Sequence, residues 1–199
     1  MKFEVNGRKP QVDPAAVVTP TAVLSGDVTV MAEAQVSFGA VLIGEEAPVA
    51  VGQGTVIREN VVIRSSGSHP VRIADHVLIG AQSALYGCEV GAGAFLATGV
   101  RIFHGAVIEE GAEVRINAVV HVNSRVRAGA TVPIGWVAVG DPASFFPPSA
   151  HDEIWEIQKG LRFPETVYGL GRLPDGQVDM RQLTRRAVER GPGLWRQID

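Results

Sequence analysis

Arg64, Tyr86 and His104 carry side chains that could act together on a small molecule. A guanidinium has a fixed positive charge and a planar fork of donors, which suits a carboxylate or a phosphate. A tyrosine hydroxyl adds a neutral donor, and a histidine can serve as a general base. These residues are far apart in the sequence, so they can form one site only if the fold brings their positions together.

A sixfold repeat of aliphatic residues predicts such a fold. Between Val18 and Val132, nineteen valine, isoleucine or leucine residues follow one another mostly in steps of six. A helix needs a period of 3.6 and a half-exposed strand a period of two, so a period of six fits neither alone. Short strands joined by turns do fit it, and three of them make one coil of a parallel β-helix. Nineteen inward positions therefore predict an all-β domain of about six coils.

The repeat is interrupted at three places. The segment IGEEAPVA (43–50) and the loop RSSGSHPVR (64–72) are insertions, whereas the step from Leu85 to Val90 is one residue short. We expect Gly87 to permit the tight corner at this short step. Cys88 takes a small inward position there and is expected to be buried packing rather than a reactive thiol.

Counting the coils in threes predicts which outward residues share a face. The residues that directly follow the inward aliphatics of one face form a column: Arg64, Tyr86, Phe103 and His121. We call it the Arg64 column, and His104 lies in the column beside it. This arrangement predicts a site that binds a small anion or acyl carboxylate through Arg64 and Tyr86, with His104 as a candidate catalytic base.

Composition narrows the class of protein. The net charge of −3 gives no electrostatic reason to expect nucleic acid as a partner. No apolar stretch is long enough to cross a membrane, and the first residues contain no apolar leader, so we expect no membrane association and a cytoplasmic location. A single cysteine excludes an internal disulfide.

The composition changes after the last repeat. We expect a β-helix domain over residues 1–148 and a C-terminal helical extension over 149–199 that packs on the β-helix or on a neighbouring subunit. Ser149 is expected to cap a helix beginning at Ala150. A second helix is predicted over Met180–Arg190, entered at Asp179 and ended by Gly191 and Pro192.

Several segments resemble the γ-class carbonic anhydrase-like proteins, among them VGQGTVIRENVVI, PVRIADHVLIG, LYGCEVGAGAFLATGV and VGDPA. The resemblance covers about residues 15–160. It implies a left-handed β-helix and a homotrimer with zinc held by three histidines between subunits. The three histidine positions are occupied here by Arg64, Ala81 and Tyr86. We therefore expect no zinc, no other cofactor and no CO₂ hydration of the usual kind.

The resemblance also places four further residues near the cleft. Ile43 and Glu45 stand where the family has an arginine and an aspartate, and Arg58 and Glu59 where it has a glutamine and an aspartate. In a family-like trimer, Glu59 and Ala81 of one chain face the Arg64 column of the next. The ligand-binding set expected on this basis comprises Arg64, Tyr86, Ala81, Glu59, Arg58 and Glu45.

Three other interpretations remain open from the sequence. The site could be purely structural, with Arg64 paired to Glu59 across the subunit interface. The same cleft could serve a CoA-linked acyltransferase or thioesterase, for which His69 in the 64–72 loop is a weak candidate. A carbonic anhydrase with a relocated metal, held by His104, His121 and an unidentified third ligand, is the least favoured.

Overall fold

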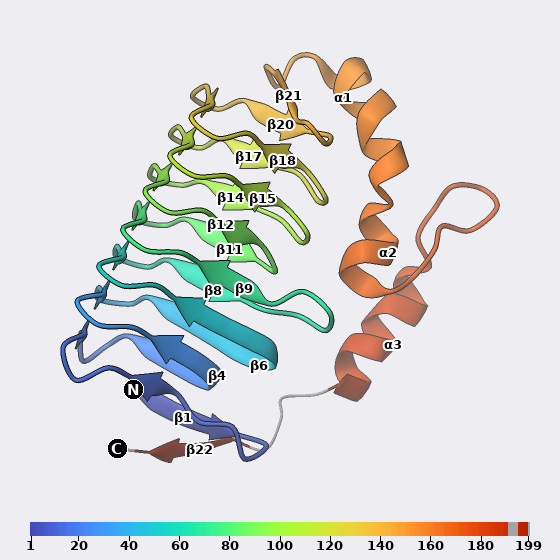
Figure 1. Cartoon of the computed structure of the whole chain (residues 1–199). Coiled ribbons are helices and arrows are strands. Elements are labelled where there is room, and N and C mark those ends of the chain that lie inside the picture. The colour runs from blue at the N-terminus through green and yellow to red at the C-terminus, as the bar shows by residue number, and fades with distance from the viewer. Residues whose placement is uncertain (191–194, 199) are drawn as a thin grey trace.

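The chain winds into a parallel β-solenoid of about eight turns, with a helical segment running along one side (Figure 1). The computed structural model describes residues 1–190 and 195–198, without the side chains of 187, 189 and 190. Most coils contribute a short strand to each of three faces, and equivalent strands of successive coils pair in parallel. The all-β fold predicted from the sixfold repeat is confirmed.

Two faces belong to one continuous sheet, because β4 (Val23–Val30) and β6 (Val41–Val51) are long enough to turn the corner between them. Face 1 contains the first halves of β4 and β6 together with six other strands: β1 (Lys2–Val5), β8 (Val62–Arg64), β11 (Ala84–Tyr86), β14 (Arg101–Ile102), β17 (Val119–Val120) and β20 (Val137–Val139). Face 2 contains their second halves with five others: β2 (Gln11–Val12), β9 (Val71–Ile73), β12 (Glu89–Val90), β15 (Val107–Ile108) and β18 (Arg125–Val126).

The remaining face is a separate sheet of seven strands. Face 3 contains β3 (Val17–Val18), β5 (Gln35–Val36), β7 (Val56–Ile57), β10 (Leu78–Ile79), β13 (Phe95–Leu96), β16 (Glu113–Val114) and β19 (Thr131–Val132). Every one of these strands has two residues, so one side chain points inward and the other outward.

The expected number of about six coils is too low. Val12 lies one six-residue step before Val18 and pairs with Val30, so the coil formed by β1 and β2 precedes the first counted repeat. Ala138 lies six residues after Val132 and stacks on Val120, but an alanine escapes a search for larger aliphatics. The solenoid therefore extends beyond the counted pattern at both ends.

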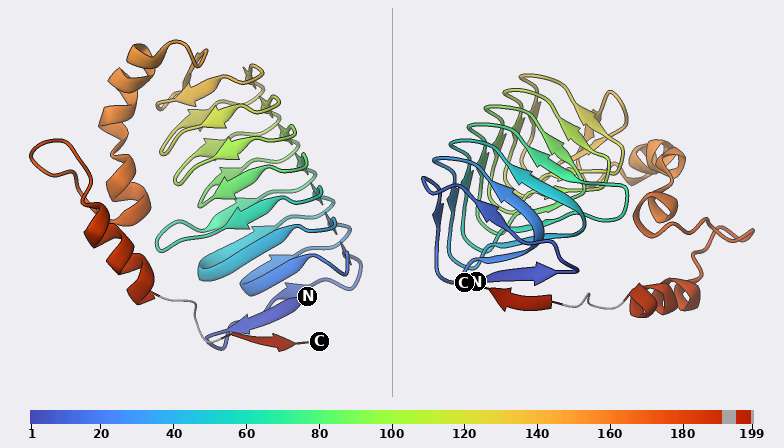
Figure 2. Two further views of the ribbon diagram at one scale, coloured as in Figure 1. Left: turned by 180° about the vertical axis from the view of Figure 1, so that it is seen from behind. Right: turned by 60° about the horizontal axis from the view of Figure 1, so that its bottom comes forward.

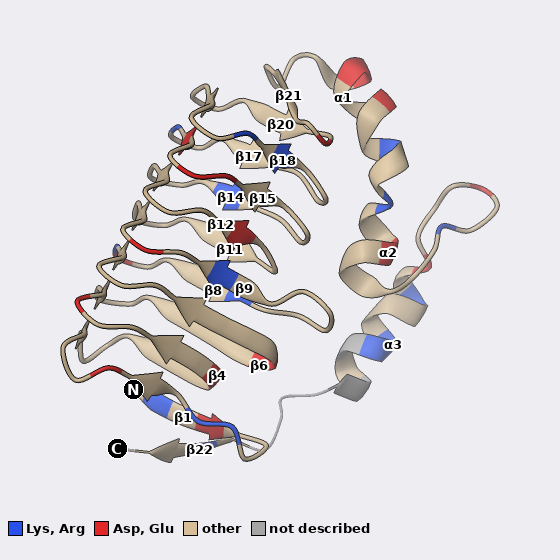
Figure 3. Ribbon diagram, viewed as in Figure 1, with Lys and Arg blue, Asp and Glu red and all other residues tan. Residues whose placement is uncertain are grey.

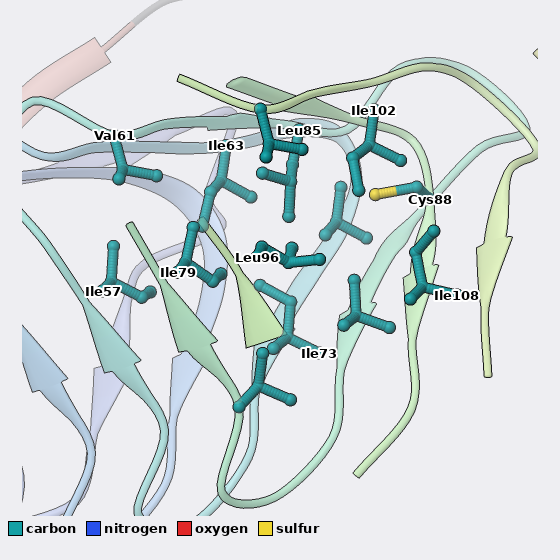
Figure 4. Close-up of a cluster of buried hydrophobic side chains, with 14 of the residues drawn as sticks. Ile57, Val61, Ile63, Ile73, Ile79, Leu85, Cys88, Leu96, Ile102 and Ile108 are labelled. Atoms are coloured by element: carbon teal, nitrogen blue, oxygen red, sulfur yellow. The ribbon is translucent and has the colours of Figure 1, made fainter. Parts of the chain in front are cut away.

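The core consists of the aliphatic residues of the repeat, stacked coil upon coil. The largest of them are fully buried: Leu24, Leu42, Ile57, Ile63, Ile79, Leu85, Leu96, Ile102 and Ile108. Cys88 packs among them, beside Ile102 and Ile108 (Figure 4). Burial, with a smaller contribution from Glu89, raises the pKa of its thiol to about 12. The thiol is therefore not ionised at neutral pH, and the packing role expected for Cys88 is confirmed.

An antiparallel strand covers each end of the solenoid. β22 (Trp195–Ile198) pairs with β1 at the first coil, so both termini lie at the same end (Figures 1 and 2). β21 (Ser144–Phe146) pairs with β20 at the last coil. Open sheet edges invite pairing with other chains, and these two strands cover the edges of face 1.

The helical segment follows β21 and returns along the solenoid (Figure 2). It comprises α1 (His151–Gln158), η1 (Lys159–Leu161), α2 (Phe163–Tyr168) and α3 (Met180–Arg190). The expected cap at Ser149 is wrong, because α1 begins at His151 with Ala150 in the cap position and no side-chain cap. The helix over Met180–Arg190 is confirmed, and Asp179 accepts hydrogen bonds from the N–H groups of Arg181 and Gln182. Its expected end at Gly191 and Pro192 lies outside the described residues.

Charged residues lie along the strands and turns of the solenoid (Figure 3), and on face 2 residues of opposite charge lie on neighbouring coils. Arg72 contacts Glu89 at 2.8 Å, and Arg125 contacts Glu109 at 3.2 Å. Such cross-strand pairs favour the observed stacking. Within the described residues no helix is long and apolar enough to span a lipid bilayer.

Candidate functional site

The strand register builds the Arg64 column as the repeat predicted. On face 1, Ile43 of β6 pairs with Arg64 of β8, which pairs with Tyr86 of β11. Stacked parallel strands lie about 4.8 Å apart, so the three side chains project from adjacent positions. The ring of Phe103 continues the column and stacks on Tyr86 with centroids 6.0 Å apart. The first sequence-predicted pair, Arg64 and Tyr86, is therefore brought together within one chain.

Among the described residues, Arg64 forms one ion pair, with Glu45. Its guanidinium Nη2 lies 3.8 Å from Oε2 of Glu45, and the hydroxyl of Ser25 donates to Oε1 of the same carboxylate at 3.1 Å. In the part of the chain that the structure describes, the guanidinium donates no hydrogen bond, and 46% of the Arg64 side chain is exposed. An arginine neutralised on one side and open on the other can take up an external acceptor.

The other half of the predicted site lies on a different face. Arg58 and Glu59 follow β7 and contact each other at 3.3 Å, and Ala81 follows β10 on the next coil. These three residues line a surface cavity of about 380 Å³ on face 3, beside the exposed side chains of Leu78 and Phe95. One chain thus separates Ala81 and Glu59 from Arg64 and Tyr86, and only a second chain could bring the two halves together.

His104 lies beside the column, as predicted, and is almost fully buried. Its ring stacks on Tyr86 with centroids 6.0 Å apart and meets the ring of His69 edge-on at 5.7 Å. Burial, followed by the charge of His69, lowers the pKa of His104 to about 4. The imidazole is therefore neutral at pH 7 and a weak base, and its buried Nδ1 has no hydrogen-bond partner among the described residues.

The corner at Gly87 explains why these rings lie so close. Gly87 has a φ of +47°, which L side chains rarely adopt, and a Cβ there would lie 2.5 Å from the Cβ of His69. The role expected for Gly87 in the shortened corner is confirmed. The 64–72 loop consequently folds back over this corner and brings His69 to His104.

The sequence predicted a helical extension that packs on the β-helix or on a neighbouring subunit, but it predicted neither α2 nor the residues that α2 covers. Phe163 packs on Phe103 and on His121, with ring centroids 6.2 and 5.9 Å apart, and the amide of Asn123 donates to the hydroxyl of Thr166 at 3.1 Å. His121 points out of the solenoid, yet it is buried beneath this helix, and burial lowers its pKa. The sequence signal for this contact is the pair of ring side chains at outward positions, Phe103 and His121.

Comparisons with known proteins agree with this architecture. The chain is 30% identical over 166 residues to "Gamma carbonic anhydrase 2, mitochondrial" of Arabidopsis thaliana, an alignment that covers 80% of this chain and 58% of the relative. It is 35% identical over 102 residues to "Gamma carbonic anhydrase 3, mitochondrial" of the same plant, covering 48% of this chain and 40% of the relative. A solved hexapeptide transferase family protein from Anaplasma phagocytophilum is 31% identical, with a TM-score of 0.53, and covers 78% of this chain and 89% of that one.

The chain belongs to the γ-carbonic anhydrase-like family of hexapeptide-repeat proteins. It spans roughly half the length of these curated plant relatives, from 40% to 58%. No model of a protein family matches the chain. Membership in this γ-carbonic anhydrase-like family accounts for the repeat and for the solenoid.

The buried imidazole of His104 predicts a pH-dependent stability. Its pKa is about 4 in the folded chain and near 6.5 when unfolded, so the unfolded chain binds more protons between these values. Stability is therefore retained above about pH 6.5 and lost as the pH falls toward 4, by on the order of 2 kcal/mol. Urea unfolding of wild type and His104→Asn measured from pH 7.5 to 4.5 checks this.

The expected result is a shallower loss of stability in His104→Asn than in wild type. His76→Asn is the matched control, because His76 is exposed at a φ of +57° that asparagine also tolerates. This control should follow the wild-type profile. Parallel profiles for wild type and His104→Asn would contradict the assignment of the pH dependence to His104.

Proposed function

We propose that this protein is a homotrimer whose intersubunit cleft holds no zinc and binds a small carboxylate or related anion. The division of the site over two faces supports the trimer. Face 1 carries Arg64 and Tyr86, and face 3 carries Glu59 and Ala81, so a cyclic arrangement joins face 1 of each chain to face 3 of the next. An isolated chain leaves both halves incomplete.

The zinc that the family resemblance implies does not fit these residues. A zinc site needs ligands with free lone pairs, usually three protein ligands and a water in a catalytic centre. Arg64 brings a positive charge that repels Zn²⁺, and the methyl side chain of Ala81 has no donor atom. Tyr86 alone cannot replace three imidazoles. No step of CO₂ hydration is therefore assigned to this cleft.

The pairing of Arg64 with Tyr86 on adjacent strands is the observation that carries the proposal. A guanidinium and a phenol carried by adjacent strands can supply a charged donor and a neutral donor to the same acceptor. Glu45 lies 3.8 Å from the guanidinium of Arg64 and accepts a hydrogen bond from the hydroxyl of Ser25. It offsets the charge on one edge of the guanidinium and leaves the other donors open to a ligand.

The absence of zinc can be measured directly on protein purified without a histidine tag. We expect less than one tenth of an equivalent of zinc per chain by plasma mass spectrometry, also after incubation with zinc and dialysis. CO₂ hydration followed by stopped flow should equal the uncatalysed rate. Stoichiometric zinc together with CO₂ hydration would overturn this part of the proposal.

Carboxylate binding is expected to depend on Arg64. Loss of a hydrogen bond to a charged group costs about 1.5–3 kcal/mol, so Arg64→Ala should weaken acetate or succinate binding by roughly 10- to 100-fold. Tyr86→Phe removes one hydrogen bond to the same carboxylate and should weaken binding by about tenfold. Titration calorimetry gives the affinities, and light scattering gives the mass of each assembly.

Arg72→Ala is the matched control, because Arg72 is also an exposed arginine paired with a glutamate on a neighbouring coil, but on face 2. It should bind carboxylates as wild type does. The proposal fails if wild type binds neither acid, or if Arg64→Ala binds them unchanged. A monomeric wild type in solution would refute the trimer.

A second function, a CoA-linked acyltransferase or thioesterase in the same cleft, is favoured by the neutral imidazole of His104 beside the Tyr86 ring. A neutral histidine can accept a proton from an attacking nucleophile, although a pKa near 4 makes it a weak base. A screen of acyl-CoA hydrolysis and transfer distinguishes the two functions. Under the carboxylate-binding proposal we expect no turnover, and turnover lost in His104→Asn would establish the enzyme instead.

A further inference from the structure

We infer that the anion bound at Arg64 carries a short apolar tail, so that the ligand is a short-chain or single-ring carboxylic acid rather than an inorganic anion. This inference rests on the proposed carboxylate site and names its class of ligand. It arises from an apolar pocket that adjoins Arg64 on face 1 and that no part of the proposed anion site uses.

The pocket has a volume of about 220 Å³. Its walls are mainly apolar side chains of the first three coils and of β22: Phe3, Val23, Val41, Ile43 and Trp195. The rings of Phe3 and Trp195, which both line the pocket, meet edge-on with centroids 6.1 Å apart. Ser25 and Glu45 form its polar edge.

The register connects this pocket to the Arg64 column without a break. Phe3 pairs with Ser25, Ser25 with Ile43, and Ile43 with Arg64, so the outward residues of four successive strands form one line. Ile43 therefore lies about 4.8 Å from the Arg64 position along the solenoid axis, and Phe3 about 14 Å. A molecule held by its carboxylate at Arg64 can lay a hydrocarbon chain across Ile43 into the pocket.

The size of the pocket limits the tail. Cavities that hold drug-sized ligands measure about 300–1,000 Å³, so a pocket of this size suits a chain of a few carbons or one ring. Apolar walls with charged groups at one end match an amphipathic molecule. A bare phosphate or sulfate would leave the apolar pocket unused.

The contacts of Glu45 favour an anionic ligand over a cationic one. Its carboxylate lines the pocket, but it is already engaged by the hydroxyl of Ser25 and by the guanidinium of Arg64. The open donors at this end belong to Arg64 and Tyr86. A carboxylate therefore finds unengaged donors there, whereas an amine would have to compete with Arg64 for Glu45.

Calorimetric titration of the assembled wild-type protein with acetate, butyrate, hexanoate and hexylamine tests the inference. Each added methylene that enters the pocket should tighten binding by about fourfold. Hexanoate should also shift the emission of Trp195 to shorter wavelength, whereas acetate should not. The shift should vanish in Trp195→Phe and persist in Trp155→Phe, which alters a tryptophan of α1.

Ile43→Ser should remove most of the extra affinity that butyrate and hexanoate have over acetate, while acetate binds as it does to wild type. Ile134→Ser is the matched control, because Ile134 is 65% exposed and lies near the far end of the solenoid. It should keep the full dependence on chain length. Arg64→Ala should weaken the binding of all the acids. This result would show that the carboxylate at Arg64 and the tail in the pocket belong to the same bound molecule.

The outcomes separate the two proposals. If no carboxylate binds, the proposed function fails and the inference fails with it. If acetate and hexanoate bind equally and both depend on Arg64, the anion site stands and the apolar subsite is refuted. Tighter binding of hexylamine than of hexanoate would overturn the assigned charge. An unchanged chain-length dependence in Ile43→Ser would also overturn the inference.

Discussion

Hydrogen bonding between equivalent strands of successive coils is the constraint on which the structure depends. Because each strand of face 3 has only two residues, the pairing leaves no freedom of register without moving the aliphatic side chain out of the core. Leu85 thus stacks between Ile63 and Ile102, and every outward neighbour is placed with it. The same strand register therefore fixes both the packing of the core and the columns of outward side chains.

The same regularity leaves an exposed sheet edge at each end of face 1, and the chain covers both edges with strands outside the repeat. β22 and β21 pair antiparallel with the first and last strands of face 1, and α2 covers the ring side chains of Phe103 and His121. Because β22 also supplies Trp195 to the apolar pocket, the strand that closes the first coil helps to form the candidate ligand site.

Strand pairing positions one half of the candidate site within the chain, whereas the other half lies on a different face. Arg64 and Tyr86 are fixed side by side by strand pairing, and Gly87 lets the next corner turn tightly enough for His69 to reach His104. Glu59 and Ala81 lie on another face, so this chain alone does not surround a ligand. The solenoid explains both features of the site. Outward side chains of one face line up along the solenoid axis, but outward side chains of different faces point away from one another.

The sequence by itself determined the solenoid, the inward aliphatics, the Arg64 column and the burial of Cys88. The repeat of six resumes after each of its three interruptions, so the inward positions of successive coils can be aligned from the sequence. It did not determine the first and last coils, since Val12 precedes the counted pattern and Ala138 is smaller than the residues counted. The tertiary structure alone decided that Glu45 engages Arg64, that α2 buries His121 and that β22 closes a pocket on face 1. These contacts join segments that share no period, so only their packing in three dimensions fixes them.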